Sequence, residues 1–478
     1  MIILGTNSIK DTGYNVANSV RFNSGDSAYM HKALGTPTST KIGTLSTWFK
    51  RAKLNQEMNL LGAETDTNSR GYLQLDDGTN GILRFWWEEG GTVTNLITNR
   101  LFRDVSAWYH VVVAYDTSQS TASNRVKIYI NGTQETSFST ETYPGQDVTT
   151  CPWNISGYNT SVGAQKGGSG SYGTFFDGYQ AETVFIDGQQ LAPTEFGEFD
   201  SDSPTIWKPK DVSGLTFGNN GFYLDYEDSA NLGNDANGGT DFTEVNLAAT
   251  DQSTDTCTNN FSTMNPLSSS VSLSSFTYTE GNLEAESDAR RGAYSNIGVS
   301  SGKWYVEAKL ISFTNGGSGT NLYGIGVAAD TFHVLNDGIG EQASAVAYLG
   351  TGTKTVANST SSFGNTYTTN DIIGIALDLD NNKIYFSKNG TFQNSGDPTS
   401  GSTGTGAIGT VAVGSTPDGA YFFNSGHQEN QAKWSFNFGS PAYAISSGNT
   451  DGNGYGNFEY AVPSGYFSIN TKNLAEYG

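Results

Sequence analysis

Two short acidic clusters contain the residue types that hydrolysis of a glycosidic bond requires. Glu284 and Glu286 stand two residues apart, a spacing that puts both side chains on one face of a strand, and Glu195 and Glu198 stand three apart. A retaining glycosidase needs two carboxyl groups about 5–5.5 Å apart at a cleft. The second pair falls in a segment that favours a helical turn rather than a cleft-lining strand. We interpret both clusters as solvated acidic surface and expect no enzymatic activity.

The histidines and cysteines add no catalytic constellation. His31, His110, His333 and His427 are scattered and show no metal-ligand spacing. His110 lies in an apolar run and is interpreted as a hydrogen-bonded core residue rather than a base. The sequence contains no Cys–His pair or phosphate-binding loop, and its Gly-x-Ser-x-Gly run at residues 298–302 leads into a strand-like run rather than the helix of a nucleophile elbow. A hydrolase that shortens polysaccharide remains the alternative.

One Gly-rich loop offers oxygen ligands suited to calcium. Asp235, Asn237 and Asp241 are spaced so that carboxylate and amide oxygens recur along the loop, as hard cations favour. The loop lacks the terminal Glu of an EF-hand. Its other interpretation is an Asx-turn loop whose side chains hold backbone amides. No other cofactor is expected.

Aromatic residues beside amides could bind a glycan. Trp153, Tyr158 and Asn159 lie in one such segment, and Tyr172 stands in a polar, Gly-rich loop where its ring has no obvious core to enter. Tyr and Trp among Asn, Ser and Gly make a recognition surface with a low entropic cost. Trp153 could equally be a core residue between strands. The prediction is that Tyr172 and Tyr158 contact a ligand.

The elements that must position these residues are short strands closed by Asn, Asp and Gly turns. Residues 108–115 form a continuous apolar run, typical of a buried strand, and residues 126–130 alternate before the turn Asn131-Gly132. Residues 71–75 and 82–87 flank Asp76-Asp77-Gly78 and predict a hairpin. Residues 222–228 predict one further strand, and residues 281–283 an early strand of the second half.

A helical turn is predicted near residue 194. Thr194 would cap it and Phe196 would be buried.

Composition supports an all-β chain and excludes several classes of function. Hydrophobic residues make up 36% of the 478 and glycine contributes 59, which suits thin β-sandwiches with many turns. The net charge of −22 would repel nucleic acid. Two cysteines, Cys151 and Cys257, cannot form a disulfide framework. No apolar run approaches a membrane span, and the first residues carry no signal peptide pattern.

The first part of the chain resembles the laminin-G-like, concanavalin A-type jelly roll. The residues that carry the resemblance are 108–111, 128–132, 176–179 and 186–197. The resemblance implies a sandwich over residues 1–205. An Asn/Gly-rich connector follows at 206–255, and we expect it to pack on a neighbouring sandwich because its aromatic residues need burial.

The last part, residues 256–478, resembles a SPRY domain, a two-sheet β-sandwich that binds partners through its loops. The matching runs are residues 301–307, 324–327, 371–378, 383–390 and 434–439. The resemblance implies a recognition module without chemistry, and so no catalytic site around Glu284. Its ligand-binding rim would include His333 and Tyr367.

The order of the pieces resembles virion proteins of tailed bacteriophages, often labelled tail-fibre or SPRY-domain proteins. The segments concerned are residues 206–210, 220–225, 258–261 and 302–305. The resemblance implies a protein on the exterior of the virion, made in the host cytoplasm. Expected partners are other virion proteins and a host surface glycan or protein, with a purely architectural decoration as the alternative. Because no heptad or shaft repeat is visible, we expect a compact spike or decoration, in a homo-oligomer that is most simply a trimer.

Overall fold

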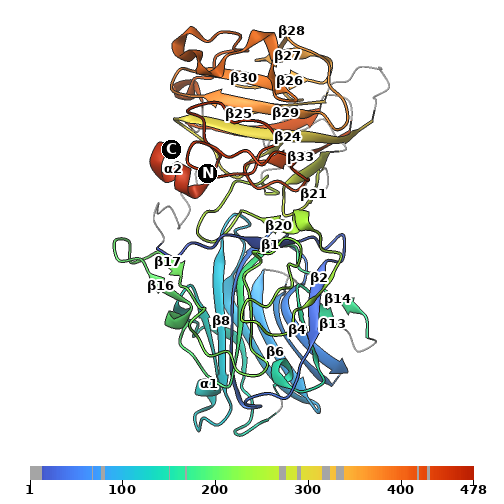
Figure 1. Cartoon of the computed structure of the whole chain (residues 1–478), viewed down its shortest axis with the longest axis vertical. Helices are drawn as coiled ribbons and strands as arrows, with labels where there is room; N and C mark the ends of the chain where they lie inside the picture. The colour runs from blue at the N-terminus through green and yellow to red at the C-terminus, as the bar shows by residue number, and fades with distance from the viewer. Residues whose placement is uncertain are drawn as a thin grey trace. The chain divides into compact units, whose positions relative to one another are not determined.

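The computed structural model describes most of the chain in two compact units (Figure 1). The described residues are 13–66, 68–76, 81–149, 151–166, 170–267, 276–287, 292–314, 323–329, 338–416, 419–427 and 431–478. The first unit ends at Thr258 and the second begins at Asn259. Among the described residues, no helix has the length and apolar character needed to cross a lipid bilayer.

The first unit is a sandwich of two eight-stranded antiparallel sheets. The first sheet has the strand order β10 (Thr133–Gln134), β9 (Val126–Ile130), β8 (Tyr109–Asp116), β3 (Ile42–Arg51), β15 (Gly178–Asp187), β1 (Ser19–Phe22) and β20 (Gln252–Ser253), with β18 (Phe222–Leu224) also paired to β15. The second sheet has the order β11 (Phe138–Thr142), β7 (Thr92–Leu101), β6 (Ile82–Glu89), β5 (Ser69–Asp76), β4 (Met58–Asp66), β12 (Asn159–Val162), β2 (Tyr29–Ala33) and β19 (Thr243–Val245).

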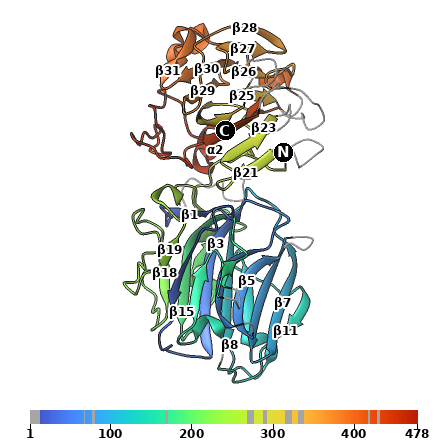
Figure 2. The same cartoon turned by 90° about the vertical axis from the view of Figure 1, so that its right-hand side faces the viewer.

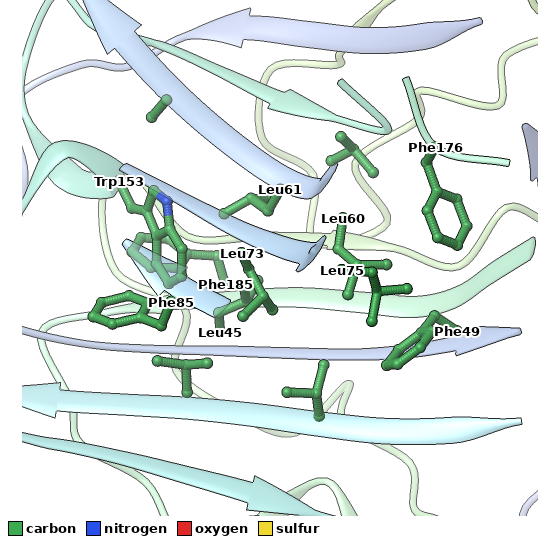
Figure 3. Close-up of a cluster of buried hydrophobic side chains, with 14 of the residues drawn as sticks. Leu45, Phe49, Leu60, Leu61, Leu73, Leu75, Phe85, Trp153, Phe176 and Phe185 are labelled. Carbon is green, nitrogen blue, oxygen red and sulfur yellow. The ribbon is translucent and has the colours of Figure 1, made fainter. Parts of the chain in front are cut away.

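Apolar side chains from both sheets fill the space between them. Leu45 and Phe49 of β3 meet Leu73 and Phe85 of β5 and β6, with Trp153 inserted beside them (Figure 3). The strands form because apolar residues alternate with polar ones, so that one face of each sheet can be buried. The predicted hairpin of residues 71–75 and 82–87 is confirmed as β5 and β6, whose connecting residues lie outside the described part.

Turn chemistry fixes the register of β8, β9 and β10. Asn131 and Gly132 adopt φ values of 47° and 76° between β9 and β10, as a tight hairpin turn requires. β9 places Val126, Ile128 and Ile130 in the core, as the alternation predicted.

The predicted connector belongs to the first unit. Its strand β18 pairs with β15 (Figure 2). β19 pairs with β2 and β20 pairs with β1, so both extend sheet edges. Trp207 of β17 (Trp207–Pro209) packs against the outer face of the first sheet, and β17 pairs with β16 (Gly197–Phe199). The expectation that this segment packs on a sandwich is met, but it supplies strands rather than a separate connector.

One local prediction is corrected. The turn near residue 194 is a single 3-10 turn, Pro193–Glu195, in which Ala192 rather than Thr194 occupies the N-cap position and no side chain caps the turn, while Phe196 is buried as expected. Proline at the first position of the turn fixes where it begins.

The second unit is also a sandwich, built from a seven-stranded and a six-stranded sheet. The first has the order β21 (Phe276–Thr279), β22 (Glu284–Ser287), β33 (Ala432–Asn437), β24 (Lys303–Phe313), β29 (Ile372–Asp378), β30 (Lys383–Lys388) and β31 (Thr391–Phe392). The second has the order β23 (Gly292–Tyr294), β32 (Tyr421–His427), β25 (Tyr323–Ala329), β26 (Val346–Leu349), β27 (Thr353–Val356) and β28 (Ser359–Ser362). The strand predicted at residues 281–283 is instead the turn between β21 and β22, because Gly281 and Asn282 have φ values of 61° and 67°.

The C-terminal segment forms a third layer on the seven-stranded sheet. Phe458 and Tyr466 pack on Tyr305 and Tyr385. The buried carboxylate of Glu307 accepts the backbone N–H groups of residues 459 and 460 at 2.9 and 2.8 Å. The chain ends in α2 (Thr471–Tyr477), and α1 of the first unit spans Ala122–Arg125.

Candidate functional site

The outward face of β6 carries an aromatic and a cationic side chain in alternation. Leu83, Phe85 and Trp87 point into the core of the first unit. The intervening Arg84 and Trp86 therefore face outward, where both are half-buried.

These side chains join those of β5 in a group that we call the arginine–aromatic platform: Arg70, Tyr72, Arg84 and Trp86. Tyr72 is paired directly with Trp86, and their rings lie 6.0 Å apart and 5° from parallel. The guanidinium carbon of Arg84 is 4.4 Å from the Trp86 ring centroid and 5.9 Å from that of Tyr72, and that of Arg70 is 6.0 Å from Trp86. Cation–π attraction holds these guanidinium groups against the aromatic rings. Burial raises the pKa of the Tyr72 hydroxyl against the opposing effect of the arginines, so the phenol stays protonated at neutral pH.

Polar groups surround the platform. Arg70 Nε donates to Glu88 Oε2 at 3.1 Å, and Arg84 Nε donates to Asn95 Oδ1 at 3.3 Å. The indole N–H of Trp86 is buried and has no acceptor among the described residues. A ligand with hydroxyl oxygens could satisfy that donor.

A second aromatic group lies on β2 and on the hairpin of β13 (Gln165–Lys166) and β14 (Tyr172–Gly173). Its members Tyr29, His31, Tyr172 and Phe175 form what we call the hairpin cluster. The Tyr172 ring stacks on Tyr29 at 4.2 Å and lies 5.4 Å from His31, while Phe175 lies 6.0 Å from Tyr29. Burial, followed by the charge of Lys166, lowers the pKa of His31, so its ring is neutral at neutral pH.

The platform and the hairpin cluster occupy one face of the same sheet. His31, Ser161, Gly62 and Tyr72 are aligned across β2, β12, β4 and β5. With strands about 4.8 Å apart, the backbones at His31 and Tyr72 are separated by about 14 Å. A Cβ at Gly62 would lie 2.9 Å from the carbonyl oxygen of Ala164, so the base of the hairpin crosses the sheet here. Glycine is required at this crossing.

Two carboxylates on this face stand on either side of Arg70. Glu64 and Glu88 flank Arg70 in the register, so about 10 Å separates their backbones. Hydrolysis needs a scissile bond between an acid and a base or nucleophile. Here the Arg70 side chain lies between them and binds Glu88.

The structure brings Asn159 and Tyr172 to this face. Asn159 is in register with Glu64 on the neighbouring strand, and Tyr172 belongs to the hairpin cluster. Sequence reasoning missed Tyr72 and Trp86. The alternation within residues 82–87 was the signal that could have identified Trp86, because it places Phe85 on the core face of the strand and Trp86 on the outward face.

The binding roles predicted for Trp153 and Tyr158 are corrected. Trp153 is 2% exposed, and its ring packs edge-on against Phe85 at 5.1 Å, so it cannot stack on a sugar. Tyr158 is buried, and its hydroxyl donates to Glu89 Oε2 at 3.1 Å.

The rim predicted for the second unit is also revised. Tyr367 is 2% exposed and packs between Tyr323, Tyr348 and Trp434, and its hydroxyl donates to the Tyr348 carbonyl at 2.8 Å. Burial raises its pKa well above the usual value. It is a core residue and not a rim residue. His333 lies outside the described residues.

The loop predicted to hold calcium is organised around a side chain of the protein. The Lys32 ammonium lies 3.3 Å from Asp235 Oδ2 and 3.1 Å from the Thr240 carbonyl oxygen. Asp241 accepts the backbone N–H of Asp235 at 3.0 Å, and Asp235 accepts that of Asn237 at 3.2 Å. These are the Asx-type contacts of the other interpretation, with an ammonium at the carboxylate. Within the described ranges, no group of three or more His, Cys, Asp or Glu side chains could hold a metal ion.

His110 is a hydrogen-bonded core residue, as predicted. The indole N–H of Trp207 donates to its Nδ1 at 2.9 Å, so the other ring nitrogen carries the proton and donates to Ser46 Oγ at 2.8 Å. Burial lowers the pKa of His110 to about 3, which keeps the ring neutral. Glu195 and Glu198 are exposed, and Glu198 pairs with Lys208 at 3.5 Å.

Two family models match the chain. One, described as the concanavalin A-like lectin/glucanases superfamily, matches residues 23–190, and the SPRY domain model matches residues 303–441. The search of curated proteins finds no match.

Solved structures share parts of the fold at low identity. Stonustoxin is 13% identical with a TM-score of 0.27, and the match covers 37% of this chain and 27% of that chain. The SPRY domain of human HERC1 is 14% identical with a TM-score of 0.27, covering 36% of this chain and 96% of that chain. Domain 4 of an extracellular arabinanase from Geobacillus stearothermophilus, in complex with arabinotriose, is 19% identical with a TM-score of 0.26, covering 34% and 68%.

Together with the two sandwiches, the family matches define the architecture. The chain is a mostly β-strand protein in which a concanavalin A-like, laminin G-like domain is followed by a SPRY domain.

Proposed function

We propose that the first domain binds a carbohydrate through the arginine–aromatic platform and does not cleave it. The observation that carries the proposal is the half-buried ring of Trp86, which lies parallel to the buried ring of Tyr72 on the outward face of a sheet of the concanavalin A-like domain. A sugar ring has an apolar C–H face that stacks on an aromatic ring, and hydroxyls that need hydrogen-bond partners. Arg84 and Asn95 supply such partners beside the Trp86 ring.

The hairpin cluster extends the same surface. Tyr172 stacks on Tyr29 and remains half-exposed, and about 14 Å of sheet separates His31 from Tyr72. That span suits several residues of a polysaccharide rather than one terminal sugar. The SPRY domain then serves as a second recognition module.

Replacing Trp86 by alanine is expected to weaken binding of the full chain to host-surface polysaccharide at least tenfold. Truncation of an aromatic anchor commonly costs about 2 kcal/mol or more, which exceeds the 1.4 kcal/mol of a tenfold change. Tyr172→Ala should weaken binding less. The measurement is titration on a polysaccharide array, followed by calorimetry on the best ligand. Phe199→Ala is the matched control, because Phe199 is an exposed aromatic residue of the same domain on β16, away from the platform.

Equal binding by Trp86→Ala and the parent chain, both folded by thermal melting, would exclude the platform. Release of new reducing ends from the bound polysaccharide would favour the depolymerase alternative. A Glu88→Gln variant, which removes a carboxylate beside Arg70, would then locate the activity.

We also propose that the chain lies on the exterior of a tailed phage particle and contacts the host surface, as a homo-oligomer. Support comes from the order of its segments, which resembles such virion proteins, and from a fold made of two recognition modules. Antibody labelling of purified particles tests this. Labelled particles that still adsorb when the antibody blocks the first domain would favour a purely architectural role.

A further inference from the structure

Lys50 and Asp255 form an ion pair that is sealed from solvent. Lys50 Nζ lies 2.7 Å from Asp255 Oδ2, and each side chain is 1% exposed. By comparison, the pair of Lys41 and Asp147 has side chains that are 35% and 59% exposed. Lys50 comes from β3 in the middle of the first sheet, and Asp255 comes from the segment after β20.

Aromatic side chains enclose this pair. Trp108 Nε1 donates to Asp255 Oδ1 at 3.1 Å, and Lys50 Nζ lies 5.4 Å from the centre of the Tyr179 ring. Trp108 and Tyr179 pack with Trp48 and Cys257 in the layer that covers the outer face of the sheet. The pair therefore sits in an apolar, water-excluded environment.

Burial without water favours a reaction between the two groups. Removing a carboxylate and an ammonium from water costs several kcal/mol per ion, and transfer of one proton converts them into a neutral amine and a neutral acid. A nitrogen 2.7 Å from a carboxyl oxygen lies about 3–3.5 Å from the carboxyl carbon, which is the range for attack. The Trp108 N–H already points at Oδ1, where negative charge develops during attack, and so acts as an oxyanion donor.

We propose that Lys50 and Asp255 condense to an intramolecular amide. Lys50 Nζ attacks Asp255 Cγ, the new C–N bond forms, and the Cγ–Oδ2 bond breaks. Two of the three ammonium protons leave with Oδ2 as water, and the third remains on the amide nitrogen. No oxidant, metal or nucleotide is needed.

The cross-link would tie the start of the first domain to its end. It closes a loop of about 205 residues (255 − 50) in a domain whose two cysteines, Cys151 and Cys257, form no disulfide. Closing a long loop restricts the unfolded chain, as a disulfide does. Unlike a disulfide, the amide cross-link would not be broken by a reducing agent.

The test is the mass of the purified full chain, measured after denaturation. The expected result is a mass one water lower than that of the sequence, with a branched peptide containing Lys50 and Asp255 after digestion. Lys50→Met should restore the full mass. Lys32→Met is the matched control and should keep the deficit, because Lys32 and Asp235 are 3.3 Å apart with the lysine 9% exposed.

A parent chain with the full sequence mass would overturn the proposal, and this result does not depend on any variant folding. A deficit without the branched peptide would also overturn it, since an aspartate can lose water within its own backbone. Slower unfolding of the parent chain than of Lys50→Met in denaturant should accompany a confirmed link.

Discussion

Replacing Trp153 by alanine is expected to lower the free energy of unfolding of the first domain by about 3–5 kcal/mol. The side chain is 2% exposed and lies between the two sheets, next to Phe85 and Leu73 (Figure 3). Gly71 leaves room for it, since a Cβ there would be 3.2 Å from Pro152 and 3.3 Å from Trp153 Nε1. Truncation would leave a large cavity that neighbouring strands, fixed by their ladders, could not fill.

The measurement is denaturant unfolding of the full chain, followed by circular dichroism and by the fluorescence of the remaining tryptophans. The transition of the first domain should shift, while that of the SPRY domain stays in place. Trp153→Phe is the control, because it keeps most of the ring volume and should cost less. A loss below about 1 kcal/mol for Trp153→Ala would contradict its place in the core.

The stability of the first domain is expected to fall as the pH rises from about 4.5 to about 8, because of Glu182. Burial is the main cause that raises the pKa of this carboxyl from 4.5 to about 8, and the charge of Asp225 adds to it. The folded domain therefore holds a proton that the unfolded chain releases in this range, so the contribution is full below pH 4.5 and is lost as the pH passes 8. A shift of this size corresponds to a change on the order of 5 kcal/mol.

The geometry at Glu182 explains why the proton matters. The residue has a φ of 49° at an irregularity in the pairing of β3 and β15. Its Oε2 accepts hydrogen bonds from Tyr223 at 2.8 Å and from Tyr14 at 3.3 Å, so the carboxyl holds both phenols in the outer layer. Ionisation would bury a negative charge close to Asp225.

Unfolding free energies measured between pH 4.5 and 9 for the parent chain and Glu182→Gln test this. The two curves should converge at low pH and diverge as the pH rises, with Gln the more stable. The comparison with Gln is needed because Glu307 of the SPRY domain, whose pKa burial raises to about 7, titrates in the same range. Parallel curves would show that Glu182 is ionised throughout.

The sequence by itself determined the strands and the two domains. Three local signals predicted the elements that form. The apolar run at 108–115 became most of β8, the alternation at 126–130 became β9, and Asn131-Gly132 became the turn after β9. His110 could be assigned to the core for the same reason. These predictions succeeded because strand period and turn chemistry depend on neighbours in the chain.

Only the tertiary structure decided which outward side chains become neighbours. Tyr72 and Trp86 are neighbours because β5 pairs with β6. Tyr172 stacks on Tyr29, which lies 143 positions earlier in the sequence (172 − 29). Lys32, near the start of the first domain's sequence, contacts Asp235 near its end. Tyr367, which was predicted at a binding rim, and Trp153, for which a binding role and a core position were both open, lie in the cores because large aromatic rings gain most from burial. Such contacts depend on strand order and on how segments fold over a sheet, and neither is encoded in the spacing of nearby residues.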